Sequence, residues 1–511
     1  MSFNLAVMLR ESADATPDAP LIHFMGSTFT YAQVDEASGR VAATLLAAGL
    51  ETGDKVAVQL PNLPQFLFAY FGILKAGLTM VPLNPLFTAR EVAYHLSDSD
   101  SRMIITSDFS VQAALEGAAE AGVKDVVAVS LGSETPSGAR SFETLLVQED
   151  TRDMAPTSSD DTAVLLYTSG TTGRPKGAEL THFELYMNCT IGPELFGLSE
   201  DDVAMAVLPL FHVFGLSSVL NAGVRYGGSM VLVPRFEVDA VLNAIEQHRV
   251  TVFAGVPTMY VSLLQADTGG RDLSSLRAAI SGGASIPGDV IRGFEEKFAG
   301  VVILEGYGLS ETASTATFNI NAEQRKVLSI GKPIWGVQAR VVDADGADLP
   351  RGADHVGEIV IRGHNVMKGY YKRPEDTAEV IRNGWFHTGD LGYMDGDGYL
   401  FVVDRVKDLV VRGGYNVYPR EVEEVLYEHP DVVEAAVIGR PDDRLGEEVV
   451  AYVVLRRGAS DDDTVLAGYA KEKLAAYKYP REYHFVDELP KGATGKILKR
   501  ELRAAPDSPV G

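Results

Sequence analysis

Cysteine is nearly absent from this 511-residue chain, which contains only Cys189. One thiol cannot form an internal disulfide or build a cysteine-ligated metal site, and such scarcity is typical of a reducing compartment. Positive charge is also scarce, because 45 Lys and Arg side chains face 70 Asp and Glu and leave a formal net charge of −25. An acidic surface repels phosphate backbones, so this balance argues against nucleic acid as the main partner.

Long apolar runs are missing as well. No segment reaches the roughly 18–20 consecutive apolar residues that a membrane-crossing helix needs. The N-terminal stretch MSFNLAVMLRESADA lacks the basic start and long apolar middle of a signal peptide. We therefore expect a cytoplasmic protein, and leave open both peripheral contact with a membrane and assembly into a homodimer.

The composition that remains, 46% hydrophobic and 23% charged, is that of a globular protein, and the length exceeds one compact core. Short apolar runs bounded by turn residues alternate with amphipathic stretches, which predicts an α/β fold with mainly parallel sheets. The expected strands include Lys55–Leu60, Met103–Thr106, Ala204–Leu208, Ser229–Val233 and Val301–Leu304, and the expected helices include Tyr31–Ala48, Leu63–Ala76 and Asp239–His248.

The pattern changes after about residue 336. Val337–Val342, Glu358–Arg362 and Tyr399–Val403 read as short strands joined by Gly- and Asp-rich turns, which is typical of a barrel-like β section. A compact α+β tail follows, with a boundary expected at residues 404–407. This predicts a large domain over residues 1–404 and a small one over residues 405–511.

A glycine-rich loop follows the strand-like run Ala163–Tyr167. Its glycines let the backbone turn tightly and aim N–H groups at one point, while hydroxyls and a lysine add donors and charge, so it suits a polyphosphate. The spacing fits neither the Walker loop nor the dinucleotide fingerprint. The candidate phosphate-binding residues are Thr168, Ser169, Gly170, Thr171, Thr172, Gly173 and Lys176.

The stretch YTSGTTGRPKG, within residues 167–177, matches the phosphate-loop signature YTSGTTGxPKG of adenylate-forming enzymes. Over nearly its whole length the sequence resembles the superfamily of acyl-CoA synthetases, luciferases and peptide-synthetase adenylation domains. It looks closest to bacterial medium- and long-chain fatty acyl-CoA ligases. The resemblance implies an ATP- and acyl-binding N-terminal domain, a mobile C-terminal domain, and ATP, Mg²⁺ and coenzyme A as cofactors.

The segment EGYGLSET, residues 305–312, resembles the family's YGxTE motif. A carboxylate at a strand's end near a phosphate loop can hold Mg²⁺, and an aromatic ring can stack on a purine. By resemblance Tyr307 and Gly308 contact adenine, Ser310 touches phosphate, and Glu311 ligates Mg²⁺ and is catalytic.

Two further motifs complete the nucleotide site by resemblance. In SGGA, Gly283 and Ala284 border the adenine and acyl pockets. In WFHTGD, Asp390 accepts from the ribose hydroxyls, and Arg405 also reaches the ribose.

The C-terminal motifs contain the residues for which the resemblance implies a conformational change. By resemblance Lys407 is the hinge of the small domain, while Gly413 and Gly414 leave room for the pantetheine arm of coenzyme A. Lys496, in LPKGATGKILKR, matches the family's catalytic lysine, which neutralises charge on the carboxylate and the α-phosphate.

The acyl site is predicted less sharply. By resemblance His212, in FHVFG, flanks the substrate carboxylate and is catalytic. No aspartate follows the aromatic residue there, which disfavours an amino acid, and no cation is present for a second carboxylate. The candidate acyl-pocket residues are Phe211, Val213, Gly215, Gly255, Val256, Thr258 and Met259.

These small and apolar residues suit an alkyl chain, and the resemblance implies conversion of a medium- or long-chain fatty acid to acyl-AMP and then to acyl-CoA. An aryl acid of the coumarate or benzoate type and loading of a carrier-protein phosphopantetheine remain alternatives. A luciferase-type oxygenase would share every motif, whereas a non-enzymatic nucleotide-binding module should have lost Lys496 or Glu311.

Overall fold

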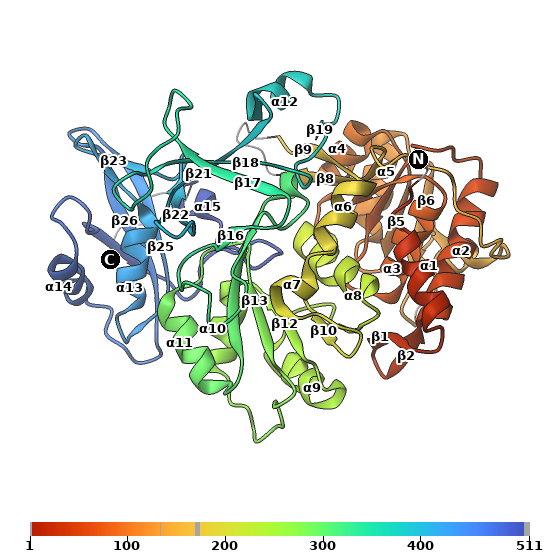
Figure 1. Cartoon of the computed structure of the whole chain (residues 1–511), viewed down its shortest axis with the longest axis horizontal. Helices are drawn as coiled ribbons and strands as arrows, with labels where there is room; N and C mark the ends of the chain where they lie inside the picture. The colour runs from red at the N-terminus through yellow and green to blue at the C-terminus, as the bar shows by residue number, and fades with distance from the viewer. Residues whose placement is uncertain (1–2, 133, 169–173, 505–511) are drawn as a thin grey trace.

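The computed structural model describes residues 3–132, 134–168 and 174–504. The described strands form four β-sheets, and the C-terminal sheet lies at the opposite end of the molecule from the sheet that contains β3 and β5 (Figure 1). No helix in the described ranges is long and apolar enough to cross a membrane.

The first sheet is parallel in its centre because β3, β4, β5, β6 and β8 are joined by crossovers. Its strands are apolar on both faces and are covered on both, as buried parallel strands require. In spatial order they are β19 Gly369–Tyr370, β9 Lys176–Thr181, β8 Thr162–Thr168, β4 Thr79–Pro82, β3 Lys55–Gln59, β5 Ser101–Ser107, β6 Asp125–Val129 and β7 Arg140–Ser141.

The second sheet has nine strands, and β10 to β14 run parallel to one another. Their carboxyl ends therefore lie along one edge of the sheet, which is where α/β folds place ligands. In spatial order the strands are β16 Lys332–Pro333, β15 Thr317–Phe318, β14 Val302–Tyr307, β13 Ala278–Ser281, β12 Val252–Gly255, β10 Val203–Ala206, β11 Ser229–Leu232, β1 Pro20–Phe24 and β2 Ser27–Thr30.

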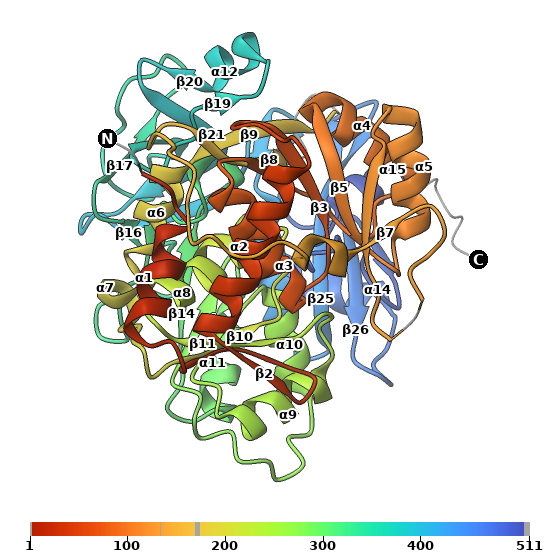
Figure 2. The ribbon, with the colours of Figure 1, turned by 90° about the vertical axis from the view of Figure 1, so that its right-hand side faces the viewer.

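Helices cover both sheets. α3 is buried along its whole length because it belongs to the core shared by both sheets, and α4 and α5 cover the other face of the first sheet (Figure 2). The helices of this part are α1 Val7–Ala15, α2 Tyr31–Ala47, α3 Pro64–Lys75, α4 Ala89–Ser99, α5 Val111–Ala121, η1 Phe142–Leu146, α6 His182–Cys189, α7 Gly192–Phe196, the π-helix η2 Phe214–Asn221, α8 Ala222–Arg225, α9 Val238–His248, α10 Pro257–Gln265, α11 Gly288–Lys297 and η3 Ser310–Thr312.

A third, antiparallel sheet forms the barrel-like section. Its strands are β17 Val337–Val342, β18 Gly357–Gly363, β21 Trp385–Met394, β20 Ile381–Arg382 and β22 Leu400–Arg405, with α12 Pro374–Val380 preceding β20. β22 pairs with β21 as far as Arg405, and the domain boundary at residues 404–407 stays a prediction.

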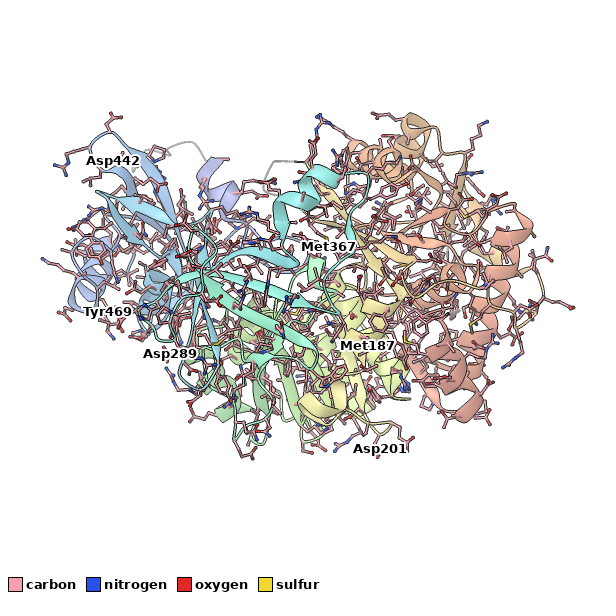
Figure 3. All side chains as sticks on the ribbon, turned by 45° about the horizontal axis from the view of Figure 1, so that its top comes forward. Met187, Asp201, Asp289, Met367, Asp442 and Tyr469 are labelled. Carbon is pink, nitrogen blue, oxygen red and sulfur yellow. The ribbon has the colours of Figure 1, made fainter. Side chains whose placement is uncertain are left out.

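The C-terminal part has its own apolar core, separate from that of the large domain. Asp289, at the start of α11, lies where the large domain meets this part (Figure 3). The elements of the C-terminal part are β23 Val410–Arg412, β24 Tyr415–Val417, α13 Pro419–Tyr427, β25 Val432–Asp442, β26 Gly446–Leu455, α14 Asp463–Lys473, β27 Glu482–Phe485 and α15 Lys499–Ala504. The predicted α/β fold class, with a barrel-like section and a small α+β domain, is confirmed.

Candidate active site

A cavity of about 1470 Å³ lies where the first three sheets meet a loop of the C-terminal part. Several of its walls directly follow the carboxyl ends of parallel strands, as the topology requires. The predicted site residues that line it are Thr168, Lys176, Phe211, His212, Val213, Val256, Gly283, Tyr307, Gly308, Ser310, Glu311, Asp390, Arg405, Lys407 and Lys496.

Other predicted residues lie elsewhere. Ser169, Gly170, Thr171, Thr172 and Gly173 lie outside the described residues. The remaining seven, which are not among the lining residues, are Ala284, Gly215, Gly255, Thr258, Met259, Gly413 and Gly414.

Three of the glycines among these seven have surroundings that explain why they do not line the cavity. A Cβ on Gly215 would come within 2.3 Å of the Pro209 carbonyl oxygen, so this glycine permits close backbone packing behind the cavity wall. Gly413 and Gly414 form the turn between β23 and β24 with φ of 58° and 84°. That turn belongs to the C-terminal sheet and does not reach the cavity in this conformation.

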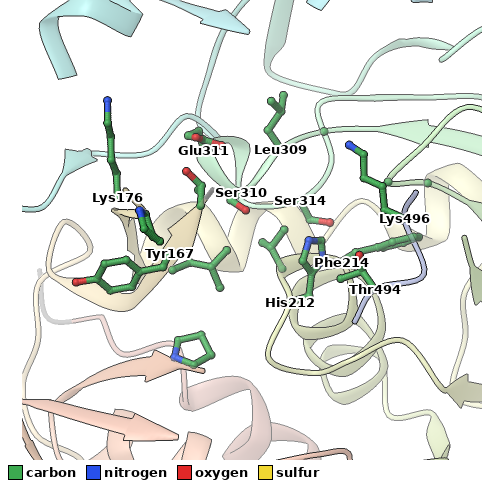
Figure 4. A pocket seen from close by; sticks show the side chains of 18 of the residues that line it. Tyr167, Lys176, His212, Phe214, Leu309, Ser310, Glu311, Ser314, Thr494 and Lys496 are labelled. Carbon is green, nitrogen blue, oxygen red and sulfur yellow. The ribbon is translucent and has the colours of Figure 1, made fainter. Parts of the chain in front are cut away.

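The predicted phosphate lysine is turned away from the centre of the site. Lys176 opens β9, directly opposite Thr168 at the end of β8, so both ends of the predicted loop are held by one antiparallel pair. Its ammonium forms an ion pair with Asp376 of α12 and lies 5.4 Å from the centre of the Tyr370 ring. The Lys176 side chain extends away from Glu311 and Lys496 (Figure 4).

The predicted metal carboxylate is fixed by a tyrosine. The Tyr370 hydroxyl donates to Glu311 Oε1 at 2.8 Å, and Glu311 is only 9% exposed. No group of three or more His, Cys, Asp or Glu in the described part of the chain could hold a metal alone. A single buried carboxylate facing the cavity suits Mg²⁺, which binds one or two carboxylates and completes its shell with phosphates and water.

Asp390, the carboxylate predicted to bind the ribose, is held in place by neighbouring side chains. Asp390 accepts a hydrogen bond from the Tyr307 hydroxyl at 2.6 Å and pairs with Arg405 at 3.0 Å. Burial, and then Asp390, raise the pKa of Tyr307 well above its ordinary value, so its hydroxyl remains a neutral donor. Glu358 accepts from the Gly389 N–H at 3.0 Å and thereby fixes the turn that presents Asp390.

The loop that carries Lys496 is docked against α10. Thr258 Oγ1 donates to the Gly495 carbonyl oxygen at 3.0 Å. Gly495 has φ of 79°, and a Cβ there would lie 2.9 Å from both Thr258 Oγ1 and Val256 Cγ2. Thr258 therefore contacts this loop in place of the cavity, and the Lys496 side chain reaches the same space as Glu311 and His212 (Figure 4).

Residues 9–371 match the family model described as AMP-binding enzyme, and residues 421–496 match the model of the AMP-binding enzyme C-terminal domain. The chain belongs to the AMP-binding enzyme family.

Named relatives agree with this assignment. The enzyme is 38% identical to a long-chain-fatty-acid–CoA ligase of Bacillus subtilis (strain 168), over 98% of this chain and 94% of the relative. It is 39% identical to a feruloyl-CoA synthase of Amycolatopsis sp, over 96% of each. ATP-bound MatB from Rhodopseudomonas palustris superposes with a TM-score of 0.91 at 35% identity, with 99% of each chain covered. The protein is an AMP-forming acid–CoA ligase, and ATP and CoA are substrates of its family.

Burial strongly affects the two predicted catalytic nitrogens of this AMP-binding enzyme. It lowers the pKa of Lys496 to about 8; Arg405 lowers it further, while Asp390 opposes the shift. Burial, with a smaller contribution from Lys496, lowers the pKa of His212 to about 4. The Phe214 N–H donates to His212 Nδ1 at 3.3 Å, so His212 is a neutral side chain with its proton on Nε2 at physiological pH.

The pKa of Lys496 gives a pH-dependence. The ammonium is present below pH about 8 and is lost above it, so kcat/KM for ATP in the free enzyme should fall roughly tenfold for each further pH unit. Pyrophosphate exchange measured across this range tests the expectation. Lys496→Arg stays charged and should lack the alkaline decline even if its maximum is lower. A wild-type profile that remains flat well above this pKa contradicts the assignment.

Two residues that bind predicted site residues were not identified from the sequence: Tyr370, which binds Glu311, and Asp376, which pairs with Lys176. Tyr370 and Asp376 lie in GYYKRPEDT, a segment that resembles the acyl- and coumarate-CoA ligases but suggested no role. Their partners lie 59 and 200 residues away, so no local periodicity could have paired them.

Proposed function

We propose that the enzyme converts a medium- or long-chain fatty acid to acyl-AMP, releases pyrophosphate, and transfers the acyl group to coenzyme A. The observation that supports this choice is the part of the cavity, here called the arm, that is lined by α6, α7, η2, β15 and neighbouring apolar residues; its described lining residues include no Lys or Arg. Its apolar lining comprises Ile191, Leu195, Phe196, Leu208, Phe214, Ala222, Ile280 and Phe318.

The polar groups of this arm are already partnered. Asn188 donates to the Thr315 carbonyl oxygen at 2.7 Å and accepts from the Thr315 N–H at 3.2 Å. The Ser218 and Ser314 hydroxyls bond each other at 2.8 Å. A second carboxylate or an ammonium buried here would have no charged partner, which is costly, whereas an alkyl chain needs none.

In the first half-reaction the substrate carboxylate attacks the α-phosphorus of ATP. A carboxylate–phosphorus bond forms, the bond from that phosphorus to the β-bridging oxygen breaks, and pyrophosphate leaves. We propose that Lys496 neutralises the charge shared by the carboxylate and the α-phosphate, that Asp390 and Arg405 hold the ribose, and that Tyr307 lies against adenine. Mg²⁺ on Glu311 would neutralise the remaining phosphate charge.

The second half-reaction needs a different surface at the same cavity. The thiolate of coenzyme A attacks the acyl carbonyl, and AMP leaves with the pair of electrons from the broken bond. We propose that rotation at Lys407 withdraws Lys496 and brings the Gly413–Gly414 turn to the acyl-AMP.

An aryl acid is the second candidate. A Cβ on Gly282 would lie 3.0 Å from Phe214 Cε1, so the Phe214 ring lies against bare backbone and leaves a flat surface. A flat slot fits an aromatic acid, and the feruloyl-CoA synthase relative belongs to that class by name.

A substrate panel separates the two candidates. Straight-chain acids from four to eighteen carbons, together with cinnamates, are compared by kcat/KM in a pyrophosphate-release assay. We expect the straight-chain acids to be preferred. A hundredfold preference for coumarate would replace the proposal with its aryl alternative.

Chain length gives a structural prediction. A small apolar pocket of about 20 Å³ adjoins the arm and shares Phe196, Ser218 and Ile280 with it. Phe196→Ala should join the two spaces and raise the kcat/KM ratio of longer to shorter acids about tenfold or more. Phe196→Leu should give a smaller shift, and thermal melting should show that both variants fold. An unchanged chain-length profile in Phe196→Ala would show that Phe196 does not limit the arm.

A further inference from the structure

The pairing of Lys176 with Asp376 is the starting point. The Lys176 side chain is 8% exposed, so its ammonium has little water around it and requires an anionic partner. Asp376 supplies that partner from α12 and keeps 27% of its own side chain exposed. The lysine predicted to hold ATP phosphates is thus occupied by a carboxylate from within the chain.

Asp376 is held at this position by its surroundings. Thr377 Oγ1 accepts from the Tyr370 N–H at 2.9 Å and donates to the Arg373 carbonyl oxygen at 2.9 Å. Arg373 in turn pairs with Asp98 of α4 at 2.7 Å. α12 is therefore anchored both to β19 and to the first sheet's covering helix, and β19 pairs directly with β9, the strand of Lys176.

Tyr370 lies between Lys176 and Glu311, the two residues predicted to act on the phosphates of ATP. Its ring faces the Lys176 ammonium and its hydroxyl binds Glu311. Rotation of the flexible lysine stem past this ring would take the ammonium from α12 toward the Glu311 side of the cavity.

We propose that Asp376 is a resting counter-ion of Lys176 that competes with the phosphates of ATP and so sets the affinity for the nucleotide. A carboxylate and a phosphate accept from an ammonium in the same way, and one ammonium cannot satisfy both fully. Asp376 thereby gives the buried lysine an anionic partner when the site holds no nucleotide, at the expense of ATP affinity. The inference rests on the proposed role of Lys176 as a phosphate ligand.

The test replaces the carboxylate while keeping its shape. Asp376→Asn should tighten ATP binding about tenfold, measured by calorimetry on the full-length enzyme without acid substrate, and should lower KM for ATP with KM for the acid unchanged. Glu375→Gln is the matched control, because it removes the same charge from an exposed neighbouring position on the same helix. It should shift ATP binding by less than twofold. Equal effects of the two variants, or weaker ATP binding in Asp376→Asn, would contradict the proposal that Asp376 competes with ATP for Lys176.

A double-mutant cycle separates this inference from the role of Lys176. Lys176→Gln should weaken ATP binding, and adding Asp376→Asn to it should give no more gain than Glu375→Gln gives. If Lys176→Gln leaves ATP affinity unchanged, the proposed phosphate contact fails. If it weakens ATP binding but the tenfold gain from Asp376→Asn persists without the lysine, the counter-ion role fails while the phosphate contact stands. Neither result depends on which acid the enzyme activates.

Discussion

Replacing Lys496 by alanine should reduce acid-dependent pyrophosphate exchange on the order of 10²–10³-fold, while supplied acyl-AMP is still converted to acyl-CoA. The reason is that the ammonium lies in the cavity with Glu311 and His212, where buried charge acts more strongly than it does in water. The second half-reaction is proposed to begin only after this side chain has left, so it should not need the ammonium. The two half-reactions are measured separately, with acyl-AMP supplied directly in the second.

Lys491→Ala is the control for this substitution. Lys491 belongs to the same loop but pairs with Glu434 at 2.8 Å within the C-terminal part, and it does not line the cavity. It should leave pyrophosphate exchange within a few-fold of the wild-type rate. Equal loss of both half-reactions in Lys496→Ala would refute the division of labour.

Proline at position 407 should have the opposite effect, sparing adenylation and lowering thioester formation by on the order of a hundredfold. Lys407 lies in the turn between β22, the last strand of the barrel-like section, and β23, the first strand of the C-terminal sheet. Proline fixes φ near −65°, so a backbone rotation at this residue would be blocked. Single-turnover measurements of acyl-AMP formation and of its consumption by coenzyme A distinguish the two steps.

Lys407→Ala separates the backbone from the side chain. The Lys407 side chain lines the cavity, and burial, with Arg405 next, lowers its pKa. If the hinge is a property of the backbone, alanine should permit both half-reactions and only proline should arrest the second. Unimpaired overall turnover in Lys407→Pro would rule out the hinge at this residue.

The hydrophobic pattern of the sequence predicted the strands whose side chains are buried in a regular order. β3, β5, β10, β11 and β14 all lie within three residues of their expected ends, because a buried parallel strand is a short apolar run between turn residues. The C-terminal strands β23 and β24 were not identified, because RGGYNV reads as a turn and its pairing depends on distant partners. Resemblance to a family supplied the site residues, and fifteen of them line one cavity.

Other features were beyond the reach of sequence patterns. Thr258 was expected to contact the acyl group, yet its hydroxyl is bonded to a residue 237 positions later. Spacing along α10 gives the direction of a side chain relative to the helix, and it carries no information on which distant segment packs there. None of the apolar residues of the arm was among the predicted acyl-pocket residues, since segments such as those of Phe196 and Phe318 adjoin only in the folded chain.

The bond from Thr258 to Gly495 couples the start of α10 to the loop that carries Lys496. Val256 directly precedes α10 and lines the cavity, Thr258 lies in the first turn of α10, and both side chains bound the space into which Gly495 fits. A mutation that changes this end of α10 to accept another acid would also disturb the contact between α10 and the loop that carries Lys496. A change of acid specificity should therefore be easier around Phe196, because the described lining residues of the small pocket there include none from the C-terminal part.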